Sequence, residues 1–444
     1  MSVLGADRPR LAEVIDDLVD PRVGLLASVS EVHKDAGAPE FFHYSAKAAN
    51  TVGLAGRENF RHTGGAAARR EDAVVKAIGE AIERYSSAWY RPAELPLTTH
   101  RQADFDAVPP EEFALYRAGQ LDRPDFPVRP FTRDTTLRWT PARDARTGAE
   151  VHVPAARVYM PYECDPRTGD TPVCQPISTG LACHESFAAA ALSGVCEVIE
   201  RDAITIVWQA MVAPPQIRVE SLPDELYDLV ARFERTAAEV TLFDVTLDHG
   251  VPTVLSALRA RHDGGPALVL AGAAAPSPAT AVRKSLEELA HTRRYSQFIR
   301  TRSPRLVPDF PDHRDVTGQQ DHLNYWSDHA NLPQAEFLFS SGERRDFDDL
   351  ADPGSGDAEQ DLRMVCERVS ATGERVLLTE LTTPDVAGLG LSVVRAVIPG
   401  FHPLQLGHVL RALGGTRLWT VPQRLGHRGI EPGTGDNPSP HPYP

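Results

Sequence analysis

Two segments of this 444-residue chain repeat one arrangement of acidic and basic side chains, and the sequence shows no other repeat. Residues 79–84 read GEAIER, and residues 196–201 read CEVIER. Positions three and four apart lie on one face of an α-helix, so each segment would present two carboxylates and a guanidinium group side by side. The six residues are Glu80, Glu83, Arg84, Glu197, Glu200 and Arg201.

A single copy of this pattern is typical of surface ion pairs, which stabilise a helix by about 0.3 kcal/mol each. Two copies, each beside a wide apolar helix face that must be buried, favour the alternative that the four carboxylates meet. Carboxylates that meet need a cation, and Mg²⁺ takes such oxygen ligands together with substrate phosphates. Arginine binds phosphate through a planar fork of N–H donors. The repeated pattern therefore indicates a nucleotide site with bound magnesium.

The common nucleotide-binding and hydrolase motifs are missing from the sequence. No lysine stands in a G-K-[ST] context, so a P-loop is excluded. No G-x-G-x-x-G follows an expected strand, and neither H-E-x-x-H nor G-x-S-x-G occurs. These absences remove the commonest zinc protease and serine hydrolase functions.

A third segment, AVRKSLEELAHTRR at residues 281–294, places Lys284 and Glu288 four positions apart. This base and acid could join the cluster of carboxylates. Pairs at this spacing also decorate most exposed helices, so the surface alternative stays open here.

Helical and strand-like patterns alternate along the chain, which predicts a mixed α/β or α+β fold. Three- and four-residue apolar spacing predicts helices over residues 72–90, 186–210 and 279–300. Strands are expected over residues 151–160, 241–246, 252–260, 267–273 and 391–400. Residues 352–360 read as an internal loop, and regular patterning stops at about residue 428.

Composition limits the possible partners. The formal net charge of -15 argues against binding to nucleic acid or to an anionic membrane surface. No apolar run reaches membrane-spanning length, and the first residues do not form a signal peptide, so we expect a cytoplasmic protein. The five cysteines include no C-x-x-C pair and suit reduced, buried thiols.

These segments resemble the YcaO family, and specifically its azoline-forming cyclodehydratases, called D proteins. GGAAARREDAVVKAIGEAIERYSSAWY (64–90) is similar to the first family motif, and STGLACHESFAAAALSGVCEVIERDAITIVW (178–208) to the second. AVRKSLEELAHTRR is similar to the third motif, while LTTPDV and VVRAVIPG resemble the closing strands. The resemblance implies a YcaO-type ATP-binding fold without a P-loop.

The resemblance also implies roles for individual residues. Mg²⁺ would be held by Glu80, Glu83, Glu197 and Glu200, and ATP would be contacted by Arg84, Arg201, Ser178, Thr179, Lys284 and Glu288. Family members often carry lysine in the glycine turn before the first helix, and we expect Arg69 or Arg70 to replace it. The implied reaction is the ring closure of a Cys, Ser or Thr side chain onto the preceding amide, whose oxygen is then phosphorylated by ATP.

The C-terminal sequence PHPYP distinguishes between YcaO relatives. Its alternating Pro440, Pro442 and Pro444 could form a solvated tail or a ligand for a partner's groove. Azoline-forming YcaO proteins end in the same pattern, and the family places that terminus in the active site. We therefore expect a cyclodehydratase domain over residues 1–427 and a Pro-rich tail over 428–444 that reaches the active site, with the Pro444 carboxylate as proton acceptor.

Two alternatives stay open. One is a non-catalytic YcaO-like subunit that binds peptide or partner, and the other is a YcaO enzyme that makes thioamides or amidines. For the preferred function, the resemblance implies a ribosomally made precursor peptide as substrate and a separate ThiF-like or related docking protein. It also implies a homodimer and allows a dehydrogenase partner.

Overall fold

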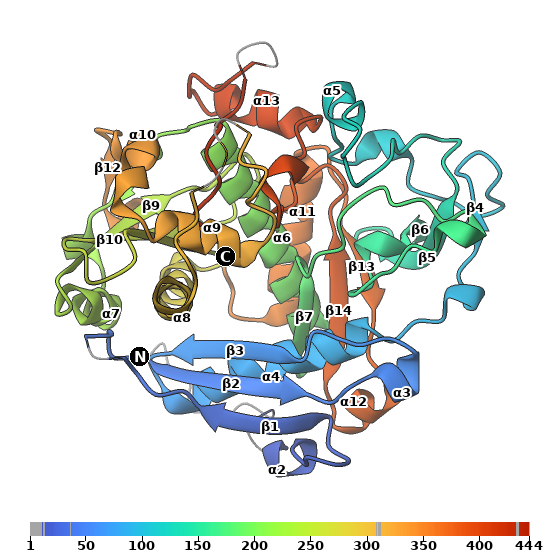
Figure 1. Ribbon diagram of the computed structural model, residues 1–444, viewed down its shortest axis with the longest axis horizontal. Helices are drawn as coiled ribbons and strands as arrows, with labels where there is room; N and C mark the ends of the chain where they lie inside the picture. Colours follow the sequence, from blue (N-terminus) through green and yellow to red (C-terminus); the bar gives the residue numbers. More distant parts are fainter. Residues whose placement is uncertain are drawn as a thin grey trace.

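The computed structural model describes residues 11, 14–35, 37–307, 309, 312–431 and 435–443. Its strands form three sheets, and three long helices lie between and beside them (Figure 1). These helices are α4 (Arg70–Ser87), α6 (Phe187–Gln209) and α8 (Pro278–Arg302). The mixed arrangement of helices and sheets confirms the predicted α+β class.

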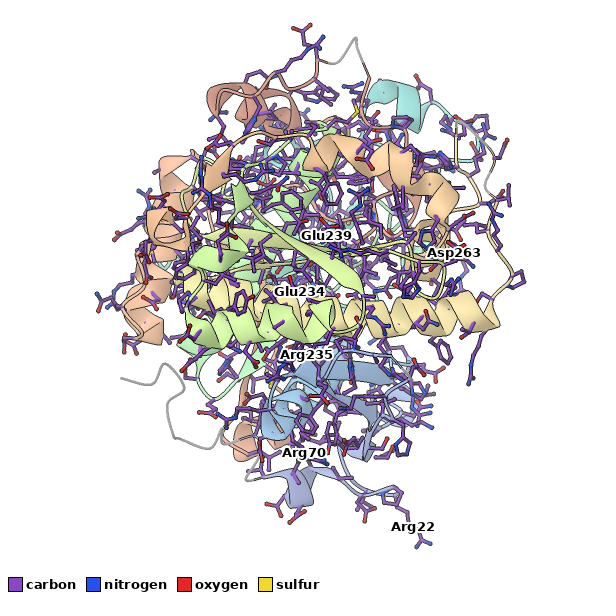
Figure 2. The ribbon with its side chains drawn as sticks, turned by 90° about the vertical axis from the view of Figure 1, so that its left-hand side faces the viewer. Arg22, Arg70, Glu234, Arg235, Glu239 and Asp263 are labelled. Carbon is purple, nitrogen blue, oxygen red and sulfur yellow. The ribbon has the colours of Figure 1, made fainter. Side chains whose placement is uncertain are left out.

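The first sheet, at the bottom of the view in Figure 1, is antiparallel in the order β1–β2–β3. Its strands are β1 (Leu26–Glu31), β2 (Phe42–Ala48) and β3 (His62–Ala67). Alternate residues of a strand point to opposite faces. Ala46 packs in one core cluster with Ala77 of α4, whereas His43 lies close to His291 of α8. The sheet therefore lies between α4 and α8, and Figure 2 shows α8 running along it.

The second sheet has six strands in the order β4–β5–β13–β14–β7, with β6 paired to β5. Its strands are β4 (Leu97–Thr98), β5 (Leu137–Asp144), β6 (Glu150–Pro154), β7 (Leu181–His184), β13 (Leu377–Glu380) and β14 (Ser392–Val397). Strand β7 leads directly into α6. The Ser186 hydroxyl starts that helix by accepting a hydrogen bond of 3.2 Å from the Ala189 N–H group.

The third sheet has the order β11–β10–β9–β8–β12 and is antiparallel except where β12 pairs with β8. Its strands are β8 (Gln216–Ile217), β9 (Ala238–Asp244), β10 (Thr253–Ala260), β11 (Leu268–Ala274) and β12 (Arg344–Arg345). Helices α7 (Asp224–Glu234) and α8 cover one face, and α6 packs against the other. Because α6 also contacts the second sheet, it is buried on nearly all sides.

Shorter helices and turns complete the molecule. The other α-helices are α2 (Ile15–Leu18), α3 (Val52–Ala55), α5 (Ala118–Leu121), α9 (Gln319–Trp326), α10 (Glu336–Phe339), α11 (Ala358–Ala371), α12 (Pro384–Gly388) and α13 (Thr416–Arg424). The 3₁₀ turns are η1 (Pro92–Glu94), η2 (Pro110–Glu112), η3 (Ala155–Arg157), η4 (Pro166–Thr168), η5 (Val219–Ser221), η6 (His329–Ala335), η7 (Phe347–Asp349) and η8 (His408–Leu410). Within the described residues, no helix has the length and apolar character needed to cross a bilayer.

The three predicted long helices are confirmed with shifts of one to three residues at their ends. The strand predicted over 151–160 is wrong beyond Pro154, because a 3₁₀ turn follows at once. The loop predicted over 352–360 is wrong from Ala358, where α11 begins. The Asp357 carboxylate starts that helix by accepting a hydrogen bond of 2.8 Å from the Gln360 N–H group.

Candidate active site

Strands β3, β7 and β11 each end the strand order of their sheet. A terminal strand leaves backbone N–H groups without a strand partner, and buried N–H groups need an acceptor. Helical glutamates supply it. The N–H group of Gly64 donates to Glu80 Oε2 at 3.2 Å, and that of Cys183 donates to Glu83 Oε1 at 2.9 Å. The first repeated segment therefore joins α4 to two different sheets.

The leading glutamate of the second repeated segment makes the same contacts as that of the first. Glu197 Oε2 accepts the N–H group of Gly180, just before β7, at 3.1 Å. Each leading glutamate also pairs with the arginine four residues on, over 3.1 Å for Arg84 and Glu80 and 3.3 Å for Arg201 and Glu197. Both copies are thus strand–helix units in which a glutamate binds a glycine N–H group 16 or 17 residues earlier.

The repeat is longer than the sequence analysis recognised. A Thr-Gly pair stands before each helix, as Thr63–Gly64 and Thr179–Gly180. This pair is the signal that would have shown that the whole strand–helix unit recurs. The predicted residues Ser178 and Thr179 lie in the turn that leads to Gly180, where the Ser178 carbonyl accepts the Leu181 N–H group at 2.9 Å.

Two carboxylates of the repeated segments, those of Glu83 and Glu200, are buried and have raised pKa values. Burial raises the pKa of Glu83 well above its usual range, and the nearby Glu80 and Glu197 raise it further. Burial also raises the pKa of Glu200 to about 7, against the opposing effect of Arg201. The structure therefore brings the four predicted carboxylates from α4 and α6 into one electrostatically coupled group.

Helix α8 joins this group, as the third motif predicts. Burial opposes ionisation of Glu288, but its hydrogen bond with His291 and the charges of Lys76 and Arg201 lower its pKa to about 2. Burial lowers the pKa of Lys284, which lies within electrostatic range of Glu200. Lys284 and Glu288 therefore lie within electrostatic range of α6, although the Glu288 side chain is 41% exposed.

A buried ion pair between α4 and α8 was missed from the sequence. Lys76 Nζ lies 2.7 Å from the carboxylate of Glu287 and also donates to the Ala66 carbonyl at 3.1 Å. The Glu287 carboxylate accepts the Ala68 N–H group at 3.3 Å. The spacing places Lys76 on the same helix face as Glu80, but no signal in the sequence pairs it with Glu287 of α8.

Arg395 of β14 is a second missed residue. Its Nη1 donates to the Ile177 carbonyl beside Ser178 at 2.9 Å. Its buried Nε has no hydrogen-bond partner among the described residues. Burial lowers the pKa of Arg395 to about 10, although the nearby Glu197 opposes this effect. A buried cation with an unused N–H group next to this turn suits an anionic ligand.

The structure does not place Arg69 with the glutamates. Arg69 precedes α4 with a partly exposed side chain, and its described contact is an ion pair with Asp72 at 3.6 Å. Arg70, labelled in Figure 2, pairs with Glu31 and Tyr44 of the first sheet. Lys76, which the sequence analysis did not consider for the glycine turn, contacts the backbone of this segment through the Ala66 carbonyl.

The C-terminal tail lies inside the molecule beside α6 and α9 (Figure 1). Residues 439–443 are buried, so the solvated-tail alternative is wrong for them. The Tyr443 hydroxyl donates to Glu200 Oε1 at 2.5 Å, and the Arg201 guanidinium lies 4.6 Å from the centre of the Tyr443 ring. Pro444, the predicted proton acceptor, lies outside the described residues.

The donor set of the site fits Mg²⁺, although the carboxylates do not converge on one point. Among residues 11, 14–35, 37–307, 309, 312–431 and 435–443, no three His, Cys, Asp or Glu side chains are grouped to hold a metal ion. Magnesium takes only one or two protein carboxylates and completes its shell with water and phosphate oxygens. Buried glutamates whose pKa stays raised despite a nearby arginine, such as Glu83 and Glu200, are suited to that role.

Fold and site together define an α+β protein in which helical carboxylates and arginines suit a magnesium–nucleotide complex without a P-loop. The family model described as the ATP- and Mg²⁺-binding YcaO cyclodehydratase matches residues 64–402. The chain therefore belongs to the YcaO family, an enzyme family with ATP and Mg²⁺ as cofactors. This match confirms the resemblance that the motifs indicated.

A relative and two solved structures extend the likeness beyond the family model. The chain is 28% identical over 361 residues to an uncharacterized protein of Methanothermobacter thermautotrophicus, covering 78% of this chain and 85% of that protein. A heterocyclase in complex with substrate and cofactor matches with a TM-score of 0.77 and 19% identity, covering 99% of this chain and 59% of its own. The YcaO protein of Methanopyrus kandleri, bound with AMPPCP and Mg²⁺, matches with a TM-score of 0.62 and 21% identity, covering 88% and 89%.

At these identities the structural matches show a shared fold. This chain spans about three fifths of the heterocyclase it resembles.

Proposed function

We propose that this protein is a peptide cyclodehydratase that converts Cys, Ser or Thr residues of a ribosomally made precursor peptide into azoline rings with ATP and Mg²⁺. The observation that carries the proposal is the buried tail, whose Tyr443 hydroxyl binds Glu200 beside the repeated glutamates. A Pro-rich tail inside the site is what the resemblance to azoline-forming YcaO proteins implies. The heterocyclase with the shared fold supports the same chemistry.

In the proposed mechanism the repeated segments bind the cofactors. Glu80, Glu83, Glu197 and Glu200 would hold Mg²⁺, with water and phosphate oxygens completing its shell. When bound, ATP supplies the phosphoryl group that makes the former amide oxygen a good leaving group. The peptide loses one water overall, because its oxygen departs as phosphate.

The remaining residues would position the nucleotide and the peptide. Arg84 and Arg201 would bind phosphate oxygens, and Arg395 would add a third guanidinium beside Ser178 and Thr179. Preorganised donors of this kind stabilise developing charge without reorganisation during the reaction.

Two further nucleotide contacts and one proton acceptor complete the mechanism. Lys284 and Glu288 would lie at the nucleotide, on the face of α8 that meets α6. The Pro444 carboxylate would accept the proton released on ring closure.

We also propose that the chain works in the cytoplasm, as a homodimer, with a separate ThiF-like or related protein that docks the precursor peptide. A dehydrogenase partner would oxidise azolines to azoles. Crosslinking of the purified chain tests the dimer, and peptide modification with and without the docking protein tests the partner.

The decisive experiment measures the mass of candidate precursor peptides incubated with ATP, Mg²⁺ and the docking protein. Ring formation removes one water per ring, and closure at Cys also removes the thiol from alkylation by iodoacetamide. Binding of peptide without phosphate release or mass change would favour the non-catalytic subunit. Replacement of oxygen by sulfur would favour thioamide formation, and loss of water with the thiol retained would favour an amidine.

Variants connect that reaction to the site. Glu200→Ala should abolish the mass change, because it removes a carboxylate from the coupled group. The matched control is Glu225→Ala, which removes an exposed carboxylate from α7. Full turnover by Glu200→Ala would refute the assignment of this residue.

A further inference from the structure

The four repeated glutamates differ in how each reaches the backbone of a sheet edge. Glu80, Glu83 and Glu197 accept backbone N–H groups directly, over 2.9 to 3.2 Å. Glu200 does not. The N–H group of Gly272 on the edge strand β11 donates to the Tyr443 hydroxyl at 3.1 Å, and that hydroxyl donates to Glu200 Oε1 at 2.5 Å.

The surroundings leave this hydroxyl a single position. Tyr443 is only 1% exposed, and its oxygen uses its proton for Glu200 and a lone pair for Gly272. A Cβ atom at position 272 would lie 2.7 Å from the Ile204 Cδ1 atom and 3.5 Å from the Glu200 Cγ atom, so a side chain there would require Ile204 to move. Gly272 therefore packs against Ile204 and Glu200 of α6 while its N–H group donates to the Tyr443 hydroxyl.

The same tyrosine holds the neighbouring cation. The Arg201 guanidinium lies over its ring at 4.6 Å and pairs with Glu200 Oε1 at 3.5 Å. The Arg201 Nε and Nη1 atoms are buried and have no hydrogen-bond partner among the described residues. The hydrogen bond from Tyr443 and the ion pair with Arg201 thus orient Glu200 through Oε1 and leave guanidinium N–H groups for an anionic ligand.

The tail is anchored independently of this hydroxyl. The indole N–H group of Trp208 donates to the Ser439 carbonyl at 3.0 Å, and that of Trp326 donates to the Pro440 carbonyl at 2.8 Å. Removing the Tyr443 oxygen should therefore leave residues 439 and 440 in place. The two indoles also report tail docking through their fluorescence.

We propose that Tyr443 is a positioning residue that replaces the missing fourth backbone contact and fixes Glu200 and Arg201 for Mg²⁺ and nucleotide. Docking of the tail would then complete the metal and phosphate site as well as bring the C-terminus to it. This inference rests on the proposed function only in assigning Mg²⁺ and nucleotide to Glu200 and Arg201.

The test is calorimetric titration of the full chain with AMPPCP in the presence of Mg²⁺. Tyr443→Phe keeps the ring and removes only the hydroxyl, so we expect about a tenfold loss of affinity, as for a hydrogen bond to a charged group. The magnesium concentration needed for half-maximal binding should rise as well. Tryptophan fluorescence should stay at the wild-type value. Tyr227→Phe, which removes an exposed hydroxyl from α7, should change none of these quantities.

A double-mutant cycle separates positioning from general loosening. If Tyr443 acts through Glu200, the Tyr443→Phe substitution should cost little affinity in a Glu200→Ala background. Additive losses of affinity in the double variant, or wild-type affinity in Tyr443→Phe, would overturn the inference. The cofactor site itself would still stand if the wild-type chain bound AMPPCP in a Mg²⁺-dependent manner. If the wild-type chain bound no AMPPCP with Mg²⁺, the cofactor site and the inference would both fall. A fluorescence change in Tyr443→Phe equal to that of a chain truncated before Pro440 would show that the hydroxyl anchors the tail, which also contradicts the inference.

Discussion

Glu83 serves both the fold and the proposed cofactor site. Its Oε1 atom accepts the Cys183 N–H group and so holds α4 against β7. Its charge, however, is buried beside Glu80 and Glu197, which raises its pKa well above the usual range. A buried charge without a counter-ion costs stability unless a cation arrives. Glu83 therefore lowers the stability of the cofactor-free protein and, in the proposed site, provides a ligand for the cation.

Replacing Glu83 by Gln should separate these two contributions. The amide keeps an oxygen for the Cys183 N–H group and removes the charge, so we expect the melting temperature of the cofactor-free protein to rise by about 2 °C. Addition of Mg²⁺ and AMPPCP should raise the melting temperature of the wild-type chain but not that of Glu83→Gln. Thermal unfolding followed by circular dichroism measures both quantities.

Glu71→Gln is the control for this prediction, because Glu71 is exposed in the first turn of the same helix. It should keep the full response to Mg²⁺ and AMPPCP. A Glu83→Gln protein that melted well below the wild type and still responded to the cofactors would show that the carboxylate is purely structural.

At the scale of elements, the strand–helix unit depends on the approach of β7 to β14. Gly180 has a positive φ of 89°, its N–H group binds Glu197, and its carbonyl accepts the Ala396 N–H group at 2.8 Å. A Cβ atom at position 180 would lie 2.3 Å from the Ala396 carbonyl oxygen. Gly180 therefore needs both its conformation and its lack of a side chain.

Gly180→Ala and Gly169→Ala form a matched pair that separates these two needs. Both glycines have φ of 89°, but a Cβ atom at position 169 would meet nothing within 4 Å. The Gly169 substitution should lower the free energy of unfolding by about 1 kcal/mol, the cost of the left-handed conformation. The Gly180 substitution should cost more than twice as much and weaken AMPPCP binding at least tenfold, because β7 must move away from Glu197.

Chemical denaturation and calorimetric titration measure these effects. Equal losses of stability in the two variants would mean that β14 yields without cost. The close approach of Gly180 to β14 would then not be required for stability or for AMPPCP binding.

The helices of the site were predictable from the sequence because their pattern is local. The two glutamates of each segment are three residues apart, so the spacing alone shows that they share a helix face. The partners of those glutamates were not predictable. Glu83 binds a backbone group 100 residues away, and Glu200 binds a hydroxyl 243 residues away.

Other residues escaped prediction for the same physical reason. Arg395 appears in a strand-like run whose pattern indicates burial but not which turn its guanidinium reaches. Lys76 and Glu287 each look like ordinary charges of an exposed helix, and only the crossing of α4 and α8 buries their contact. The strand predicted over 151–160 failed because its apolar composition continues past Pro154 although the backbone turns there.

At the scale of the whole molecule, α6 connects the site to distant parts of the chain. Asp202, directly after Arg201, is fully buried and binds the His402 N–H group at 2.8 Å and Arg417 of α13 at 2.8 Å. Arg417 also contacts Asp248 at 2.8 Å. The tail packs on the same helix through Trp208. The tail therefore contacts α6 both at Trp208 and, through Tyr443, at Glu200.

Buried histidines line the place where the tail docks. The rings of His441 in the tail and His322 of α9 stack with their centres 3.9 Å apart. Burial lowers the pKa of His441 to about 4, and the charges of Arg201 and Arg411 act in the same direction against its two backbone hydrogen bonds. Burial likewise lowers the pKa of His322 well below its usual range, and His441 adds to this effect. His408 also lies within electrostatic range of His441.

Tail docking should consequently weaken as the pH falls below about 6.5. A released His441 takes up a proton near its ordinary pKa of about 6.5, whereas the docked ring resists protonation until about pH 4, so acid favours release by about 1.4 kcal/mol per pH unit for each such histidine. The fluorescence of Trp208 and Trp326, followed from about pH 7 to about pH 4.5, should change in this interval and stay constant above it. His441→Gln should reduce the number of protons taken up on tail release by about one, so the fluorescence should depend less steeply on pH. His33→Gln, which alters an exposed ring, should leave the pH dependence unchanged. An equally steep pH dependence of the fluorescence in His441→Gln would show that other groups cause the transition and that His441 does not contribute.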